Sequence, residues 1–190
     1  NITVPELAEV KRVLNNNFWF IKPEKDFTLE SILKHVKQLK KTKGIDAFVI
    51  DAWNKLEHKY GQSETKYIGE SLDKIAEFCE INNVHCFLVA HPTKILKNKN
   101  TGLYEVPNLY NIAGSANFYN KTDNGISVYR NFTEDKTEVY VQKVKFSHWG
   151  KIGCAELMYH LDSGRFVTNF ISDLYNWIDY HERKLPKETE

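Results

Sequence analysis

The sequence predicts an α/β domain with a parallel central sheet, and two apolar runs joined by a helix are the observations that predict it. Residues 45–51 form a short apolar run that ends in Asp51, and residues 84–91 form a second run that ends in His91. Residues 63–83 between them have the apolar spacing of one amphipathic helix. A strand, a helix and a second strand in this order form a βαβ unit, whose crossover makes the two strands parallel.

The ends of these two strands predict where a ligand binds. In open parallel sheets, ligands bind beyond the carboxyl ends of the strands, and Asp51 and His91 both lie there. An aspartate after four apolar residues is Walker B-like, because its carboxylate can hold a magnesium-bound water beside the phosphates of a nucleotide. Taken singly, each residue has an alternative interpretation, a loop cap for Asp51 and a hydrogen-bonded structural histidine for His91.

Two amphipathic helices precede the βαβ unit. The first follows the capping box that begins at Thr3 and ends near Asn15, and the second begins at the candidate N-cap Thr28. The four apolar residues at 18–21, cut by Pro23, predict one more strand between these helices. The first half of the chain therefore supplies strands for the sheet and helices that flank it.

The second half of the chain has a different pattern. Residues 92–112 are polar, lysine-bearing and rich in turn residues, which predicts a mobile loop. Four stretches between residues 125 and 167 alternate with period two, which predicts a β-meander. Residues 170–178 then place apolar side chains at helical spacing. We therefore expect a core of residues 1–167, followed by a C-terminal helix and charged tail at residues 168–190.

Composition narrows the class of protein. A length of 190 residues suits one domain with a real core. The net charge of +1 excludes an overall polyelectrolyte, so any contact with nucleic acid must come from a local patch. The three cysteines have no metal-ligand spacing, which predicts a reduced cytoplasmic protein. No apolar run approaches the roughly 20 residues that a membrane span needs.

Two groups of lysines each have two interpretations. Lys143 and Lys145 lie on one face of a predicted strand, where they either protect a sheet edge or present two cations to a phosphate. Lys94, Lys97 and Lys99 lie in the predicted loop, where they either follow a nucleic-acid backbone or are simply solvated. Spacing alone does not decide between these alternatives.

Five segments, taken in order, resemble the motor domain of DnaB-like replicative helicases of the phage primase–helicase and Twinkle type. They are IDAFVID (45–51), FLVAHPTK (87–94), IAGSAN (112–117), DNGISVYR (123–130) and QKVKF (142–146). The resemblance implies a RecA-like core with a parallel central sheet, flanking helices and a C-terminal β-meander. It also implies an enzyme that hydrolyses ATP or another NTP with Mg²⁺ and forms a homo-hexamer. Such an enzyme moves along single-stranded DNA in the cytoplasm, that of the host if the protein is viral.

The resemblance assigns nucleotide-site roles by position. Asp51 matches the Walker B aspartate that supports magnesium. His91 matches the residue that senses the γ-phosphate and couples hydrolysis to the DNA loops. Arg130 and Tyr159 match an arginine and a tyrosine that sandwich the base of the nucleotide.

The resemblance also implies positions that act on DNA and on a neighbouring subunit. Lys143 and Lys145 match a basic pair that reaches the ATP site of the next subunit. Lys145 stands where the family usually has an arginine finger, and lysine lacks the planar bidentate fork of arginine. The positions that match DNA-binding residues are Lys94, Lys97 and Lys99 in one channel segment, and Gly114, Ser115 and Asn117 in a second.

A second departure concerns the phosphate-binding loop. The 190 residues contain no Gly-x-x-x-x-Gly-Lys-[Ser/Thr] motif. In this family the P-loop and the catalytic glutamate precede the first segment of resemblance. We therefore expect the C-terminal part of an ATPase core, inactive without its P-loop. The alternatives are a non-catalytic nucleic-acid-binding or scaffold module on a degenerate RecA-like fold, and a RecA-like recombinase or signalling ATPase.

Overall fold

The chain forms two compact units, Asn1–His91 and Pro92–Glu190. The structure is a computed structural model, and it describes residues 3–59, 61, 63–99, 102–112 and 116–168. The predicted C-terminal helix and tail lie almost entirely outside the described residues, so the division at residue 167 stays a prediction.

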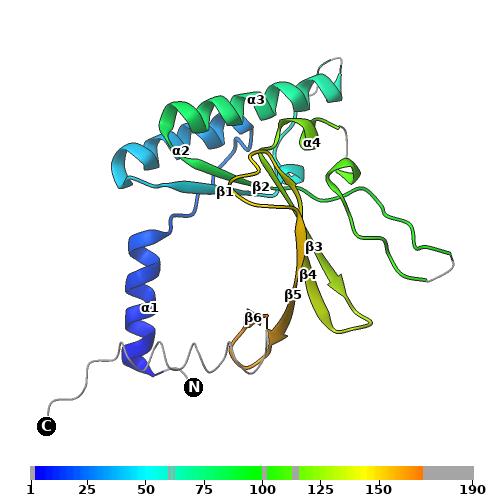
Figure 1. Ribbon diagram of the computed structural model, residues 1–190. Coiled ribbons are helices and arrows are strands. Elements are labelled where there is room, and N and C mark those ends of the chain that lie inside the picture. The colour runs from blue at the N-terminus through cyan, green and yellow to red at the C-terminus, as the bar shows by residue number, and fades with distance from the viewer. Residues whose placement is uncertain (1–2, 60, 62, 100–101, 113–115, 169–190) are drawn as a thin grey trace, which may run out of the picture. The chain divides into compact units, whose positions relative to one another are not determined.

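The first unit contains the predicted βαβ arrangement (Figure 1). Its elements are α1 (Val4–Asn17), α2 (Leu29–Lys43), β1 (Ala47–Asp51), the short helix η1 (Trp53–Lys55), α3 (Glu64–Asn82) and β2 (His85–Val89). β1 and β2 pair in parallel, with Ala47 opposite His85 and Asp51 opposite Val89. The parallel pairing predicted from the two apolar runs is therefore confirmed.

Short polar residues and left-handed residues set the ends of these helices. Thr3, Thr28 and Ser63 occupy the N-cap positions, and each side chain accepts a backbone N–H from the first turn. Gly44 ends α2 with a φ of 72°, and Asn83 ends α3 with a φ of 49°. The capping residues thus place β1 and β2 directly after their helices.

The helices α2 and α3 cover one face of the two-stranded sheet (Figure 1). Phe48 and Ile50 point to this face and are 7% and 4% exposed. Val49, Phe87 and Val89 alternate with buried or half-buried positions, and they are 62%, 54% and 38% exposed. A parallel sheet normally has both faces covered. In the part of the chain that the structure describes, this sheet has one covered face.

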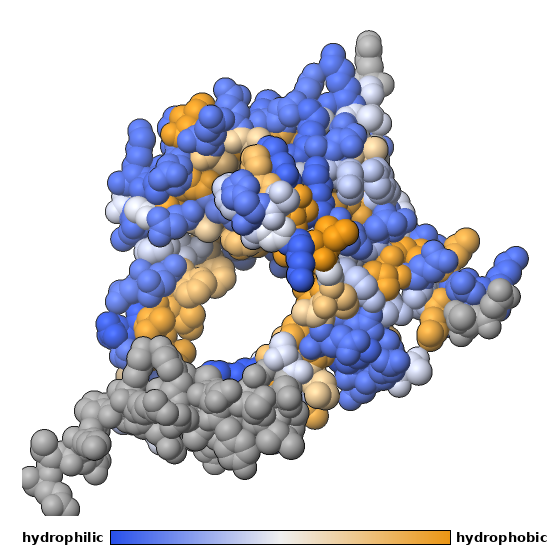
Figure 2. All heavy atoms as spheres, viewed as in Figure 1, coloured by the Kyte–Doolittle hydropathy of each residue, from blue (hydrophilic) through white to orange (hydrophobic). Residues whose placement is uncertain are grey.

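The helix α1 has no buried residue. Its expected apolar side, formed by Leu7, Val10 and Leu14, remains between 41% and 48% exposed. Figure 2 shows apolar side chains along one side of this helix and hydrophilic ones along the other. The amphipathic pattern is therefore present, although the described part of the first unit does not cover it.

The strand predicted at residues 18–21 does not form. Phe18 donates its backbone N–H to Leu14 O over 2.9 Å and so closes the last turn of α1. Phe20 is 95% exposed, and residues 18–21 belong to no sheet. A strand needs a partner for its backbone groups, and the sheet that includes β1 is described with β2 alone. This expectation was wrong for the structure as described.

The second unit carries the predicted β-meander. Its elements are η2 (Leu109–Asn111), α4 (Asn117–Lys121), β3 (Asn124–Asn131), β4 (Lys136–Val144), β5 (Gly153–His160) and β6 (Arg165–Val167). The strands form one antiparallel sheet in the order β3-β4-β5-β6. Gly164 has a φ of 66° in the predicted hairpin turn between β5 and β6. The period-two pattern therefore predicted both the strands and their order.

The segment between β2 and η2 has defined backbone pairing. Isolated antiparallel bridges join Pro92 to Ile112 and Lys97 to Tyr104. The Tyr129 hydroxyl donates to Tyr104 O over 3.0 Å and ties this segment to β3. The segment expected as a mobile loop is thus a long excursion whose two sides contact each other.

Gly125 allows η2 to pack closely on β3. A Cβ added at Gly125 would lie 2.2 Å from Leu109 Cδ1, whereas a Cβ at Gly153 would have nothing within 4 Å. Gly125→Ala should therefore lower the free energy of unfolding by about 1–3 kcal/mol because Leu109 must move. Gly153→Ala, the matched control in β5, should change it by less than about 0.5 kcal/mol. Urea unfolding measures both, and equal midpoints for the two variants would contradict this packing.

Candidate functional site

Asp51 and His91 lie at the same edge of the parallel sheet. Asp51 is the last residue of β1 and pairs with Val89, and His91 follows two residues after Val89. Both residues are exposed. Among the described residues, neither the Asp51 carboxylate nor the His91 imidazole has a side-chain hydrogen bond or ion pair. The structure thus places two unengaged polar groups at neighbouring strand ends, as the sequence predicted.

The turn after Asp51 is held firmly by aromatic packing. Trp53 is 3% exposed, and its ring lies 4.6 Å from the ring of His58. His58 Nε2 lies 2.9 Å from Trp53 O, and Nδ1 lies 3.4 Å from the Tyr67 hydroxyl on α3. The peptide bond between Asp51 and Ala52 is cis. The Asp51 carboxylate therefore stands on a turn that is fixed to the start of α3.

Asn54 connects the two strand ends. Its side-chain Oδ1 accepts the backbone N–H of His91 over 3.0 Å. Asn54 belongs to η1, which directly follows the turn after Asp51. Sequence reasoning missed this residue, because the contact joins positions 37 residues apart and no local pattern marks it.

A magnesium ion fits the chemistry of this edge through a single protein carboxylate. Among the residues that the structure describes, no group of three His, Cys, Asp or Glu side chains could hold a metal ion. Mg²⁺ keeps several waters and commonly binds through one or two carboxylates together with substrate phosphates. Asp51 can therefore supply one ligand, and the remaining ligands would be water and phosphate oxygens.

The predicted DNA-binding residues lie in the second unit. Lys94, Lys97 and Lys99 are exposed on the excursion between β2 and η2, and Lys97 Nζ lies 5.1 Å from the Tyr104 ring centroid. Asn117 is the first residue of α4 and is half-buried. Gly114 and Ser115 lie outside the described residues.

Arg130 and Tyr159 share one face of the antiparallel sheet. Arg130 pairs with Thr137, which pairs with Leu157, and Tyr159 lies two residues further along β5. Directly opposed residues in antiparallel strands point to the same face, as do residues two apart in one strand. Arg130 forms an ion pair with Asp135. The structure thus brings the two predicted base-binding residues to one face near the β3–β4 turn.

The two lysines of β4 have different surroundings. Lys143 is half-buried, and its Nζ donates to Tyr119 O over 2.5 Å and to Asn120 O over 3.3 Å. Lys145 Nζ forms a 2.6 Å ion pair with Asp123 Oδ1, in which both side chains are more than half exposed. Lys143 is therefore engaged by the end of α4, whereas Lys145 is held by a surface contact.

A hydrogen-bonded carboxylate lies on β4 near the β3–β4 turn. Glu138 is 7% exposed and accepts hydrogen bonds from the Tyr140 hydroxyl and from Asn131 Nδ2. The Tyr140 bond, followed by the Asn131 bond, lowers the pKa of Glu138, and the same Tyr140 bond raises the pKa of Tyr140. Both groups therefore keep their ordinary protonation states at neutral pH.

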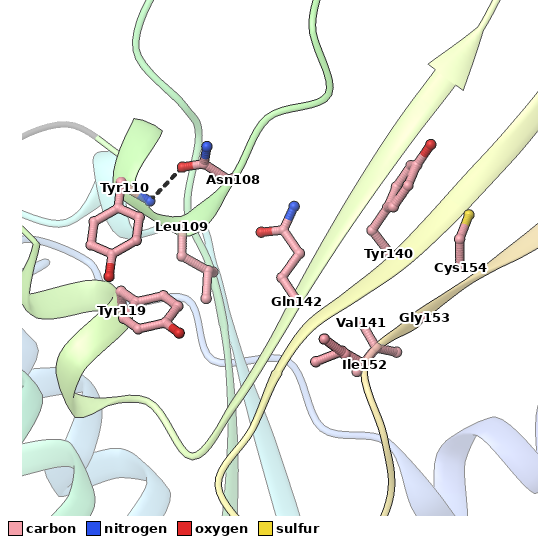
Figure 3. Close-up of a pocket in the computed structure, with 10 residues that line it drawn as sticks. All are labelled: Asn108, Leu109, Tyr110, Tyr119, Tyr140, Val141, Gln142, Ile152, Gly153 and Cys154. Atoms are coloured by element: carbon pink, nitrogen blue, oxygen red, sulfur yellow. Dashed lines mark hydrogen bonds between the residues drawn. The ribbon is translucent and has the colours of Figure 1, made fainter.

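A cavity of about 600 Å³ lies between η2, α4 and strands β4 and β5 (Figure 3). The Tyr110 and Tyr119 rings stack there at 4.5 Å with an interplanar angle of 20°. Gln142 Nε2 donates to Pro107 O over 2.8 Å, which leaves its buried Oε1 without a partner among the described residues. None of the predicted site residues lines this cavity.

Comparisons with known proteins point to one family. No family model matches the chain. A Twinkle homolog protein of Arabidopsis thaliana, named chloroplastic/mitochondrial, is 38% identical over 195 aligned residues, which cover 98% of this chain. The same alignment covers 26% of the Arabidopsis protein, so this chain spans about a quarter of the length of that relative.

A solved structure shows the same fold. The ATPase domain of a DnaB-like helicase superposes with a TM-score of 0.69 and 18% identity, over 87% of this chain and 60% of that domain chain. No helix in the described part of the chain is long and apolar enough to cross a membrane. The chain therefore belongs to the DnaB-like helicases, with the RecA-like fold of their ATPase domain.

Proposed function

We propose that this chain is the C-terminal part of an ATP-dependent DNA helicase motor that couples nucleotide hydrolysis to movement along single-stranded DNA. The observation that carries the proposal is the pair of unengaged polar groups, Asp51 and His91, at neighbouring ends of parallel strands. The Twinkle homolog supports it, because 98% of the chain aligns with that protein. The 190 residues hold no P-loop motif, so we expect them to be inactive without upstream sequence.

Each residue of this edge has a role in the proposal. Asp51 would hold a magnesium-bound water through its carboxylate. Bound magnesium neutralises charge that develops on the phosphates. His91 would donate a hydrogen bond toward the γ-phosphate, and Asn54 would keep its backbone beside the turn that carries Asp51. The rigid turn at Trp53 supports this geometry, because catalytic groups need fixed positions.

The second unit would supply the remaining contacts of a homo-hexamer. Arg130 and Tyr159 would enclose the base of ATP or another NTP. Lys145, with Lys143 behind it, would act on the nucleotide of the neighbouring subunit. Lys145 suits this role because it is exposed and held by a surface ion pair that is cheap to break.

Single-stranded DNA would contact the excursion between β2 and η2 together with Gly114, Ser115 and Asn117. Each phosphate contact on a single strand contributes about 0.7 to the slope of log affinity against log salt. Replacing Lys94, Lys97 and Lys99 by methionine should therefore weaken binding of an oligo-dT strand and reduce the slope by about 2. Fluorescence anisotropy at several salt concentrations measures both quantities.

A matched triple variant separates this proposal from a general effect of charge. Lys34, Lys37 and Lys41 are exposed on α2, and the sequence indicates that they form a solvated face. Their replacement by methionine removes the same charge and should leave the salt slope unchanged. Equal losses in the two triple variants would contradict a DNA contact by the excursion.

One observation favours a second candidate function. The missing P-loop motif also suits a non-catalytic nucleic-acid-binding or scaffold module on a degenerate RecA-like fold. That module would bind DNA in the assay above and would not hydrolyse ATP in any natural form. The cytoplasmic location expected from the sequence also remains a prediction, and the Arabidopsis relative is named chloroplastic/mitochondrial.

A further inference from the structure

We infer that Asp123 is the positioning residue for Lys145, and that the turn carrying Asp123 connects Lys145 to the DNA-facing segment at α4. The inference rests on the proposed function and adds a route by which DNA contact at Asn117 reaches the trans-acting lysine. All of its contacts lie within the second unit.

Two contacts join Asp123 to Lys145. The Lys145 backbone N–H donates to Asp123 O over 2.9 Å, and Lys145 Nζ lies 2.6 Å from Asp123 Oδ1. Asp123 therefore fixes both the strand end and the ammonium group of this lysine. Exposed ion pairs contribute little to stability, so the ammonium group can leave Asp123 when a phosphate competes for it.

Lys143 fastens the same turn to the same strand. Its ammonium group donates to Tyr119 O and Asn120 O near the C-terminus of α4, where unpaired carbonyls favour a cation. The Lys143 Nζ atom also lies 5.0 Å from the Tyr119 ring centroid. Two lysines of β4 thus grip residues 119–123 at two points.

This double grip makes a short mechanical path. Asn117, a proposed DNA contact, begins α4, and Asp123 follows the last residue of α4 by two positions. A shift of α4 on DNA binding would move Asp123 and, through it, Lys145. Coupling of this kind needs contiguous contacts between elements, which the bonds from Lys143 and Lys145 supply.

A double-mutant cycle tests the inference in the longer protein that carries this segment. Asp123→Asn should lower DNA-stimulated ATP hydrolysis about tenfold, within the usual range of coupling between sites. The same substitution should have no further effect when Lys145 is alanine, because Asp123 acts through that side chain. Asp123→Glu keeps the carboxylate and should restore most of the rate. Asp162→Asn, which removes an exposed carboxylate from the β5–β6 turn, should leave the rate unchanged.

Three outcomes overturn the inference. A neutral Asp123→Asn variant would show that Lys145 needs no positioning. A loss that persists in the Lys145→Ala background, or that Asp123→Glu fails to rescue, would show a merely structural role. Thermal unfolding of each variant checks that the fold is retained. A wild-type protein without DNA-stimulated hydrolysis would overturn the proposed function as well, whereas the first two outcomes overturn the positioning role alone.

Discussion

Replacing Asp51 by asparagine lowers magnesium-dependent ATP hydrolysis by roughly 100- to 1,000-fold in the longer protein that carries this segment. The reason is the loss of the negative charge that holds the magnesium-bound water beside the phosphates. Asp51 is exposed and has no side-chain partner among the described residues, so its replacement should leave the unfolding temperature unchanged. Steady-state hydrolysis at saturating ATP, together with a thermal melt, measures both effects.

Asp46 provides the matched control for this variant. It lies just before the opposite end of β1, and its side chain is fully exposed. Asp46→Asn removes the same charge from the far edge of the sheet and should keep near wild-type turnover. Retained hydrolysis in Asp51→Asn, or an equal loss in both variants, would refute the assignment of Asp51 as the magnesium-supporting residue.

Replacing His91 by alanine uncouples hydrolysis from unwinding. The imidazole would lose its contact with the γ-phosphate, while the backbone N–H of residue 91 would keep its bond to Asn54. The number of ATP molecules hydrolysed per base pair unwound should therefore rise by about tenfold. Parallel measurements of hydrolysis and strand separation on a forked DNA give this ratio.

His85 is the matched control for His91. It is exposed at the start of β2, at the opposite edge of the same strand, and its ring contacts Phe87 at 4.6 Å. His85→Ala should leave the ratio of hydrolysis to unwinding unchanged. Wild-type unwinding by His91→Ala would rule out a sensor role for this histidine.

The fold was predictable where local chemistry decides it. The caps at Thr28, Ser63 and Gly44 each act within a few residues, and the structure uses all three. The apolar runs ending at Asp51 and His91 gave the parallel pair, since a helical crossover leaves few other arrangements. Period-two alternation gave the antiparallel meander for the same reason.

The strand expected at residues 18–21 shows where local chemistry is insufficient. Four apolar residues favour a strand, yet a strand forms when a neighbouring backbone pairs with it. Phe18 instead closes α1, and Phe20 remains almost fully exposed. Pairing depends on residues distant in the chain, which a local pattern does not reveal.

The candidate site divides in the same way. Asp51 and His91 could be found because strand ends in parallel sheets gather ligand-binding groups. Asn54 could not, because its bond to His91 joins two elements that the sequence separates. The different surroundings of Lys143 and Lys145 were equally hidden, because they depend on carbonyls and a carboxylate at residues 119–123.

The measurement that tests the central claim most directly is ATP hydrolysis with and without single-stranded DNA, by the 190-residue chain and by the longer protein that includes an upstream P-loop. The motor assignment predicts no turnover by the 190 residues and magnesium-dependent, DNA-stimulated turnover by the longer protein. Turnover by the 190 residues alone would place the phosphate site elsewhere. No turnover by the longer protein would contradict the motor assignment and favour a non-catalytic module.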